Sequence, residues 1–128
     1  ANLFLVNVPV TIIPLNQAIR VTESIRTEFS TRAQRGSTKC NIISQLISAH
    51  EKLTKGQVPF YLHSTVTAMV AMQPELCVSL QKSKIRVVTS EYDMGRTYVT
   101  EAPSTTTEVN VCTEVNHPSI LKMLYDSC

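Results

Sequence analysis

The sequence has little of what phosphate-binding enzymes and nucleic-acid-binding proteins rely on. Its 128 residues include three glycines and no tryptophan, and aromatic residues make up only 5%. No GxGxxG, GxxxxGK[ST], GxSxG or HExxH motif occurs, which removes the common phosphate-binding loops, the serine-hydrolase elbow and the zinc-protease helix. Few aromatic residues and a net charge of +2 weigh against a nucleic-acid partner. No apolar run approaches the roughly 18 residues that a transmembrane helix needs, so no transmembrane segment is expected.

What is present suits one globular domain spanning residues 1–128. Hydrophobic residues make up 43% and charged residues 17%, a composition that excludes a disordered chain. The four cysteines, at positions 40, 77, 112 and 128, include no CxxC pair, so we expect two disulfides and no metal or cofactor. Disulfides indicate a secreted, extracellular protein, and a start at Ala1 indicates that a signal peptide was removed.

Four cysteines allow three connectivities, and spacing alone does not select one. We favour Cys40 with Cys77 and Cys112 with Cys128, because both closures are local and each would anchor a helix to a sheet. If the strands that carry Cys77 and Cys112 are neighbours, those two residues could instead bridge directly. Both cysteines are expected on the more polar face of the sheet.

The first half of the chain predicts a strand followed by a helical hairpin. Apolar residues alternate over residues 3–12, which indicates a strand that ends at Pro14. From Leu15 the spacing becomes helical and continues to a stop at Gly36. A second helix follows up to Gly56, with a wide apolar face that includes a stripe of four residues: Ile42, Leu46, Ala49 and Leu53.

The second half predicts mostly antiparallel strands and a terminal helix. Strands are expected at residues 60–72, 76–80, 84–92, 97–102 and 109–115, with a hairpin turn at 93–96 and a loop at 103–107. Pro118 opens a short C-terminal helix. The order of elements predicts an α+β two-layer sandwich, in which the helical hairpin and the C-terminal helix pack on a mostly antiparallel sheet.

Two groups of residues are candidates for binding a ligand or partner. Tyr61, His63 and Thr65 share one face of the predicted strand at 60–72 and could form a polar site there. His50 and His117 fit structural roles better. The segment between Arg20 and Lys55 holds seven basic and three acidic residues, and its basic edge could meet an anionic partner. That edge has four members: Arg26, Arg32, Arg35 and Lys39.

With no catalytic motif, the sequence favours a secreted, disulfide-stabilised, non-enzymatic interaction protein. It would bind a protein or cell-surface partner, an anionic one included, or self-associate as a homodimer, because its long strands leave edges to cover. One alternative is a carrier that holds a small apolar ligand between helices and sheet. A second is a small histidine-dependent ribonuclease or toxin.

Overall fold

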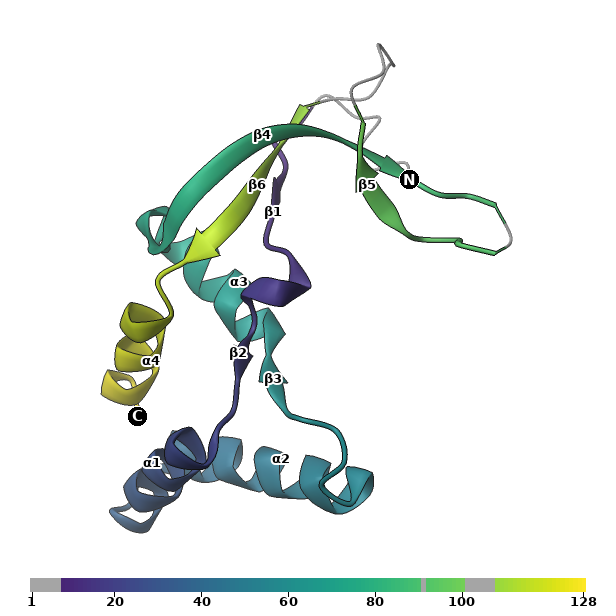
Figure 1. Ribbon diagram of the computed structural model, residues 1–128. Helices are drawn as coiled ribbons and strands as arrows, with labels where there is room; N and C mark the ends of the chain where they lie inside the picture. The colour runs from purple at the N-terminus through teal and green to yellow at the C-terminus, as the bar shows by residue number, and fades with distance from the viewer. Residues whose placement is uncertain (1–7, 91, 101–107) are drawn as a thin grey trace. The chain divides into compact units, whose positions relative to one another are not determined.

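The computed structural model describes residues 8–90, 92–100 and 108–128. The chain divides into two compact units, one of Ala1–Pro14 and Cys77–Val115, the other of Leu15–Leu76 and Asn116–Cys128. Within the described ranges, the first unit holds a four-stranded sheet, and the second holds four α-helices and a two-stranded sheet (Figure 1). The α+β class expected from the sequence is confirmed, and the single domain stays a prediction.

The expected helical hairpin is present in the second unit. Helices α1 (Glu23–Gln34) and α2 (Thr38–Thr54) pack against each other. Each begins at a hydroxyl residue, Thr22 or Ser37, whose side chain accepts a hydrogen bond from the backbone N–H three residues on, at 3.4 and 3.2 Å. Gly36, with φ +99°, makes the short join between them.

The first helix begins later than the periodicity predicts. Leu15–Gln17 is a single 3-10 turn, η2, and Ile19–Arg20 is a short strand, β2. The predicted helix is therefore wrong before Glu23. The physical reason is the extended backbone of Thr22, which caps α1 and leaves Ile19 to be buried from a strand instead.

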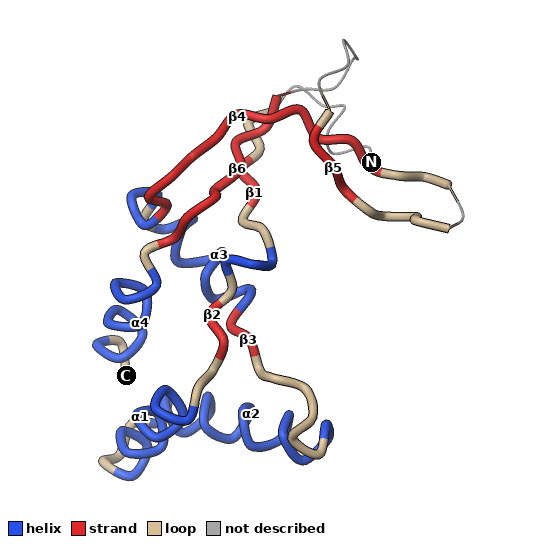
Figure 2. Tube along the Cα trace, in the orientation of Figure 1, coloured by secondary structure: helices blue, strands red, loops and turns tan. Residues whose placement is uncertain are grey.

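The predicted strand at residues 60–72 is wrong for most of its length. Only Tyr61–Leu62 is extended, as β3, which pairs with β2, and His63–Met72 is helix α3 (Figure 2). The buried side chains of α3 follow helical spacing: Val66, Met69 and Val70. β-Branched residues disfavour a helix by only a few tenths of a kcal/mol each, so burial at these positions decides the conformation.

The C-terminal helix α4 (His117–Asp126) begins where the sequence predicts. The side chain of Asn116 caps it by accepting a hydrogen bond from the Ser119 N–H at 3.1 Å, and Pro118 lies in its first turn. The 3-10 turn η3 (Pro74–Leu76) follows α3. Fully buried side chains of the unit include Phe29, Cys40, Val66 and Ile120.

The sheet of the first unit has the strand order β1-β6-β4-β5. Strand β1 (Thr11–Ile12) runs parallel to β6 (Glu108–Val115), and β4 (Cys77–Val87) pairs antiparallel with β6 and with β5 (Thr97–Val99). The described residues between β4 and β5 include the expected turn, where Gly95 has φ +89° and donates to the Val88 carbonyl at 2.9 Å. The mostly antiparallel sheet is thus confirmed.

Several strand boundaries differ from the prediction. The strands expected at residues 76–80 and 84–92 are one strand, β4, with register irregularities between Cys77 and Leu80. Of the strand expected at 3–12, residues 3–7 lie outside the described part of the chain, and only β1 is extended in the remainder. The loop expected at 103–107 and the end of the strand at 97–102 also fall outside it.

The favoured disulfide pairing is wrong. The structure pairs Cys40 with Cys128, with Cα atoms 5.6 Å apart, and Cys77 with Cys112, with Cα atoms 5.9 Å apart. The direct Cys77–Cys112 bridge forms because β4 and β6 are neighbours. Cys112 is fully buried and does not lie on an exposed polar face.

The apolar face of α2 is only partly buried. Cys40 and Ile47 are at most 1% exposed, but Ile42, Leu46 and Leu53 from the predicted apolar stripe are exposed.

Candidate functional site

Tyr61 and His63 are the predicted site residues that the structure brings together. Their ring centroids lie 5.5 Å apart with the ring planes tilted by 31°. Leu62, between them, is buried and anchors the backbone, while both rings lie on the exposed side. The result is a pair of surface rings whose hydroxyl and imidazole groups are open to a ligand.

His63 stands on a helix and not on the strand that the sequence predicts. It is the first residue of α3, and the preceding Leu62 makes no capping hydrogen bond with its side chain. Leucine has no acceptor group, so no side chain at that position can satisfy the N–H groups of the first turn. This end of α3 therefore presents donors and the positive end of the helix dipole beside the imidazole.

Arg20 is a neighbour of this pair that sequence reasoning missed. In the antiparallel pairing of β2 with β3, Arg20 lies opposite Tyr61, and Ile19 lies opposite Leu62. Ile19 and Leu62 are buried and Arg20 is exposed. Two-residue strands have no detectable alternation, so the sequence held no signal for this pairing.

The sequence predicted that Thr65 would share a site with Tyr61 and His63, but the structure places Thr65 in the lining of a cavity that includes neither of them. Thr65 is half-buried, and this cavity of about 140 Å³ lies within the second unit. The other lining residues are all apolar: Phe29, Ile43, Leu46, Phe60, Leu62 and Leu124. Thr65 supplies the sole side-chain hydroxyl of that lining.

Three of the four residues of the predicted basic edge are engaged inside the second unit. Arg26 forms ion pairs with Glu23, at 3.7 Å, and closely with Glu51. Arg32 pairs with Glu28 at 2.6 Å.

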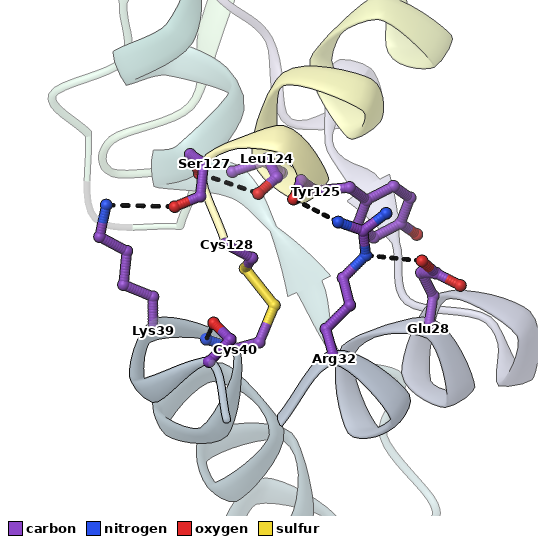
Figure 3. Close-up of a disulfide and its surroundings, with 9 residues drawn as sticks. Glu28, Arg32, Lys39, Cys40, Leu124, Tyr125, Ser127 and Cys128 are labelled. Carbon is purple, nitrogen blue, oxygen red and sulfur yellow. Dashed lines mark hydrogen bonds and ion pairs between the residues drawn. A yellow bond between two sulfur atoms is a disulfide. The ribbon is translucent and has the colours of Figure 1, made fainter. Parts of the chain in front are cut away.

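Figure 3 shows Arg32 and Lys39 reaching the C-terminal end of α4. Arg32 donates to the Tyr125 carbonyl at 2.6 Å, and Lys39 donates to the Ser127 carbonyl at 3.1 Å. Both bonds reach carbonyls at the C-terminal end of α4, next to the Cys40–Cys128 disulfide (Figure 3). The Tyr125 carbonyl also accepts from the Cys128 N–H at 3.2 Å, so Arg32 is its second donor.

Arg35 is exposed, as Lys39 is, but it takes part in none of the ion pairs or side-chain hydrogen bonds described for the other three basic residues. It lines an open surface hollow of about 430 Å³ together with Arg32, Gly36, Ser37 and Cys128.

The Tyr125 ring links α4 to α1. It meets Phe29 edge-on at 5.2 Å between centroids, and the Arg32 guanidinium lies 5.2 Å from the ring centre. Burial raises the pKa of the Tyr125 phenol, the charge of Glu28 raises it further, and the charge of Arg32 opposes both effects.

The remaining histidines have structural partners, as expected. A ring nitrogen of His50 lies 3.0 Å from the Val58 carbonyl, and one of His117 lies 2.8 Å from the Gln17 carbonyl. His50 also packs edge-on against Phe60. Both imidazoles therefore help to hold loops and helix ends in place.

The described residues contain no group of three or more histidine, cysteine, aspartate or glutamate side chains that could hold a metal ion. None of the helices in the described ranges is both long enough and apolar enough to cross a bilayer.

No family model and no curated protein matches the sequence. The fold, in contrast, is similar to that of solved structures. The inosine-uridine preferring nucleoside hydrolase from Bacillus anthracis superposes with a TM-score of 0.76 at 22% identity, over 100% of this chain and 40% of that one. An inosine-guanosine nucleoside hydrolase superposes with a TM-score of 0.74 at 19% identity, over 93% of this chain and 38% of that one. This chain thus has the fold of part of these proteins and spans less than half of their length.

These likenesses overturn the functional expectation from the sequence. A non-enzymatic interaction protein was favoured because no catalytic motif was found, yet the proteins that share the fold are enzymes. The carrier and ribonuclease alternatives have no counterpart among them either. The error came from treating short linear motifs as a requirement for catalysis, whereas active-site residues can be contributed by separate parts of a fold.

Proposed function

We propose that this chain takes part in nucleoside hydrolysis, and that Tyr61 and His63 are the side chains with which it contacts the nucleoside. The supporting observation is the fold, which over the whole chain follows that of an inosine-uridine preferring nucleoside hydrolase. The exposed ring pair at the start of α3 is the part of the described surface best suited to such a ligand.

The chemistry of the reaction fits these side chains. Hydrolysis breaks the bond between C1′ of the ribose and a nitrogen of the base, and water forms the new bond to C1′. The departing nitrogen is a poor leaving group unless it receives a proton. A protonated imidazole can donate that proton, so His63 is the general acid in this proposal. The Tyr61 ring, 39% exposed, offers a face on which a base or sugar can stack.

A secreted protein remains our proposal for the location. Its support is the two disulfides, which use all four cysteines and persist in oxidising compartments. An anionic partner has weaker support, because Arg26, Arg32 and Lys39 have partners within the chain and only Arg35 of the basic edge is exposed without one of these contacts.

Titration of the chain with inosine, followed by NMR of its three histidines, tests the contact. The His63 ring signals should shift with saturation, whereas those of His50 and His117 should not, because backbone carbonyls already engage those rings. These two residues are internal controls for a general change in fold. Unmoved His63 signals at millimolar inosine would remove it from the proposed site.

The catalytic role has a separate test. Release of free base from inosine, uridine and guanosine is measured for the parent and for His63→Gln. Loss of a general acid lowers kcat by about 10² to 10⁴-fold. Thr67→Ala is the matched control, since Thr67 is exposed on the same helix, where it donates to the His63 carbonyl. Equal rates in the parent and His63→Gln would refute the role of His63.

A further inference from the structure

The two disulfides of this chain lie in different surroundings. In each bridge one cysteine is fully buried, Cys40 or Cys112, and the other is half-buried, Cys128 or Cys77. Cys128 lines the open hollow of about 430 Å³, so a thiol in solution approaches the Cys40–Cys128 bond from this side. An attacking thiol therefore meets Cys128, and Cys40 is the residue that leaves.

Cys40 has surroundings that stabilise a departing thiolate. It is the third residue of α2, where the positive end of the helix dipole favours a negative charge. Figure 3 shows its disulfide between the side chains of Lys39 and Arg32, which donate to carbonyls at the end of α4. Arg32 also pairs with Glu28, so Lys39 and the helix end contribute more of the stabilisation. A stabilised thiolate leaves faster in thiol–disulfide exchange.

The hollow also has a positive charge in its lining that no carboxylate neutralises. Arg35 is exposed there, and among the residues that the structure describes neither Arg35 nor Lys39 forms an ion pair. An attacking thiolate is an anion, so this charge raises its local concentration at the hollow. The basic side chains therefore favour both the incoming thiolate and the departing one.

The Cys77–Cys112 disulfide has the opposite surroundings. The Cys77 sulfur lies 3.3 Å from the Ser79 carbonyl oxygen, and the Cys112 sulfur lies 3.3 Å from the Glu114 carbonyl oxygen. After reduction each sulfur would carry a hydrogen that it can donate to its carbonyl, which favours the neutral thiol over the thiolate. Both cysteines lie in strands, β4 and β6, so neither is in the first turn of a helix. Neither sulfur is therefore a favoured leaving group.

We propose that the Cys40–Cys128 disulfide, the exchange bridge, is a thiol–disulfide exchange site that a dithiol reductant opens in the folded protein. One thiolate of the dithiol forms a bond to the Cys128 sulfur, the Cys40–Cys128 bond breaks, and its electron pair leaves with Cys40. The second thiolate attacks the dithiol sulfur of this mixed disulfide, so Cys128 leaves as a thiolate and takes a proton from water. The protein gains two electrons, and the dithiol is oxidised to a disulfide.

Opening the exchange bridge changes what holds the C-terminal helix. The remaining contacts between the end of α4 and the helical hairpin include the hydrogen bonds from Arg32 and Lys39 and the edge-on packing of Tyr125 on Phe29. These contacts keep the two thiols close, so an oxidant disulfide can restore the bridge by the reverse steps. The proposal concerns this bridge alone and does not depend on nucleoside hydrolysis.

Timed reduction of the folded chain tests the proposal. The oxidised protein is treated with dithiothreitol in native buffer, free thiols are blocked with N-ethylmaleimide at intervals, and peptide mass spectrometry follows each cysteine. The exchange bridge should open about tenfold faster than the Cys77–Cys112 bridge, which is the control bridge in the same molecule. Equal rates, as reduction through global unfolding would give, or faster opening of the control bridge would overturn the proposal.

The direction of attack has a separate readout. Glutathione is a monothiol, so its first reaction leaves a mixed disulfide on the sulfur that it attacks and a free thiol on the other cysteine. After rapid blocking with N-ethylmaleimide, glutathione should be found on Cys128 and the maleimide on Cys40, in about tenfold excess over the reverse arrangement. Glutathione on Cys40, or an equal division between the two, would overturn the proposal, because Cys40 would then not be the favoured leaving group.

Charge variants test the effect of the basic side chains. Lys39→Gln/Arg35→Gln should slow the opening of the exchange bridge by about threefold and leave the rate of the control bridge unchanged. The matched variant Lys52→Gln/Lys55→Gln removes two exposed charges at the other end of α2, and both rates should stay as in the parent. An exchange bridge that opens as fast as in the parent, or faster, after loss of Lys39 and Arg35 would overturn the proposal.

Discussion

Removing the Cys40–Cys128 disulfide should cost the protein several kcal/mol of stability. This bridge closes a loop of 88 residues, for which the loss of chain entropy in the unfolded state gives about 4.6 kcal/mol. The Cys77–Cys112 bridge lies inside that loop and spans 35 residues. With it intact, the effective loop falls to roughly 54 residues and the expected loss becomes about 4.2 kcal/mol. Burial of Cys40 adds a small cavity cost when alanine replaces it.

Guanidinium unfolding of Cys40→Ala/Cys128→Ala, followed by circular dichroism, measures this loss. The dependence of the unfolding free energy on denaturant should also steepen, because an unfolded chain without the crosslink exposes more surface. The matched control, Cys77→Ala/Cys112→Ala, should lose about 3.8 kcal/mol by the same relation. A loss below about 1 kcal/mol with an unchanged slope would refute the loop-entropy account. The contacts of Arg32 and Lys39 with α4 would then be the main restraint on the C-terminus.

Two further predictions concern the ring contacts between α1 and α4. Phe29→Ala should lower the free energy of unfolding by about 3 to 5 kcal/mol, because Phe29 is fully buried against Tyr125. Chemical unfolding measures this loss, with Ser24→Ala at an exposed position of the same helix as the control. A loss under about 1 kcal/mol would contradict the packing of Phe29. Folding raises the pKa of Tyr125, so the folded state holds the phenol proton more tightly than the unfolded state does. The free energy of unfolding should therefore fall as the pH rises through the unfolded pKa near 10 towards the higher folded pKa. Tyr125→Phe should flatten that alkaline decline, and an identical pH profile in the variant would contradict it.

The sequence predicted what depends on local signals. The hairpin turn at residues 93–96 and the helix that opens at Pro118 were each identifiable from one or two residues, and the structure has both features. The strand predicted at residues 60–72 failed because threonine and valine satisfied an alternating pattern and a helical one equally well over a ten-residue segment. Tertiary burial chose between them.

The candidate site was only partly within reach of sequence reasoning. Tyr61 and His63 are two residues apart and come together in either conformation. Arg20 lies beside them because β2 pairs with β3, and each of these strands has only two residues. Arg20 and Tyr61 are more than 40 residues apart in the sequence, so no local pattern predicts that they are neighbours. Arg32 and Lys39 likewise donate to carbonyl groups about 90 residues further along the chain. Two residues of the predicted basic edge therefore contact the end of α4, which their positions in the sequence do not indicate.

The pairing of Cys40 with Cys128 has a consequence for biosynthesis. In the secreted protein that we propose, Cys40 and Cys77 enter the oxidising compartment first, and Cys128 is the last of the four cysteines to do so. Until Cys112 and Cys128 have been synthesised, the only thiol available to Cys40 is that of Cys77, and neither residue has its native partner. A Cys40–Cys77 bridge is therefore the expected early product of oxidation, and reaching the native pairs then depends on thiol–disulfide exchange. Folding of this chain in the cell should accordingly depend on a disulfide isomerase.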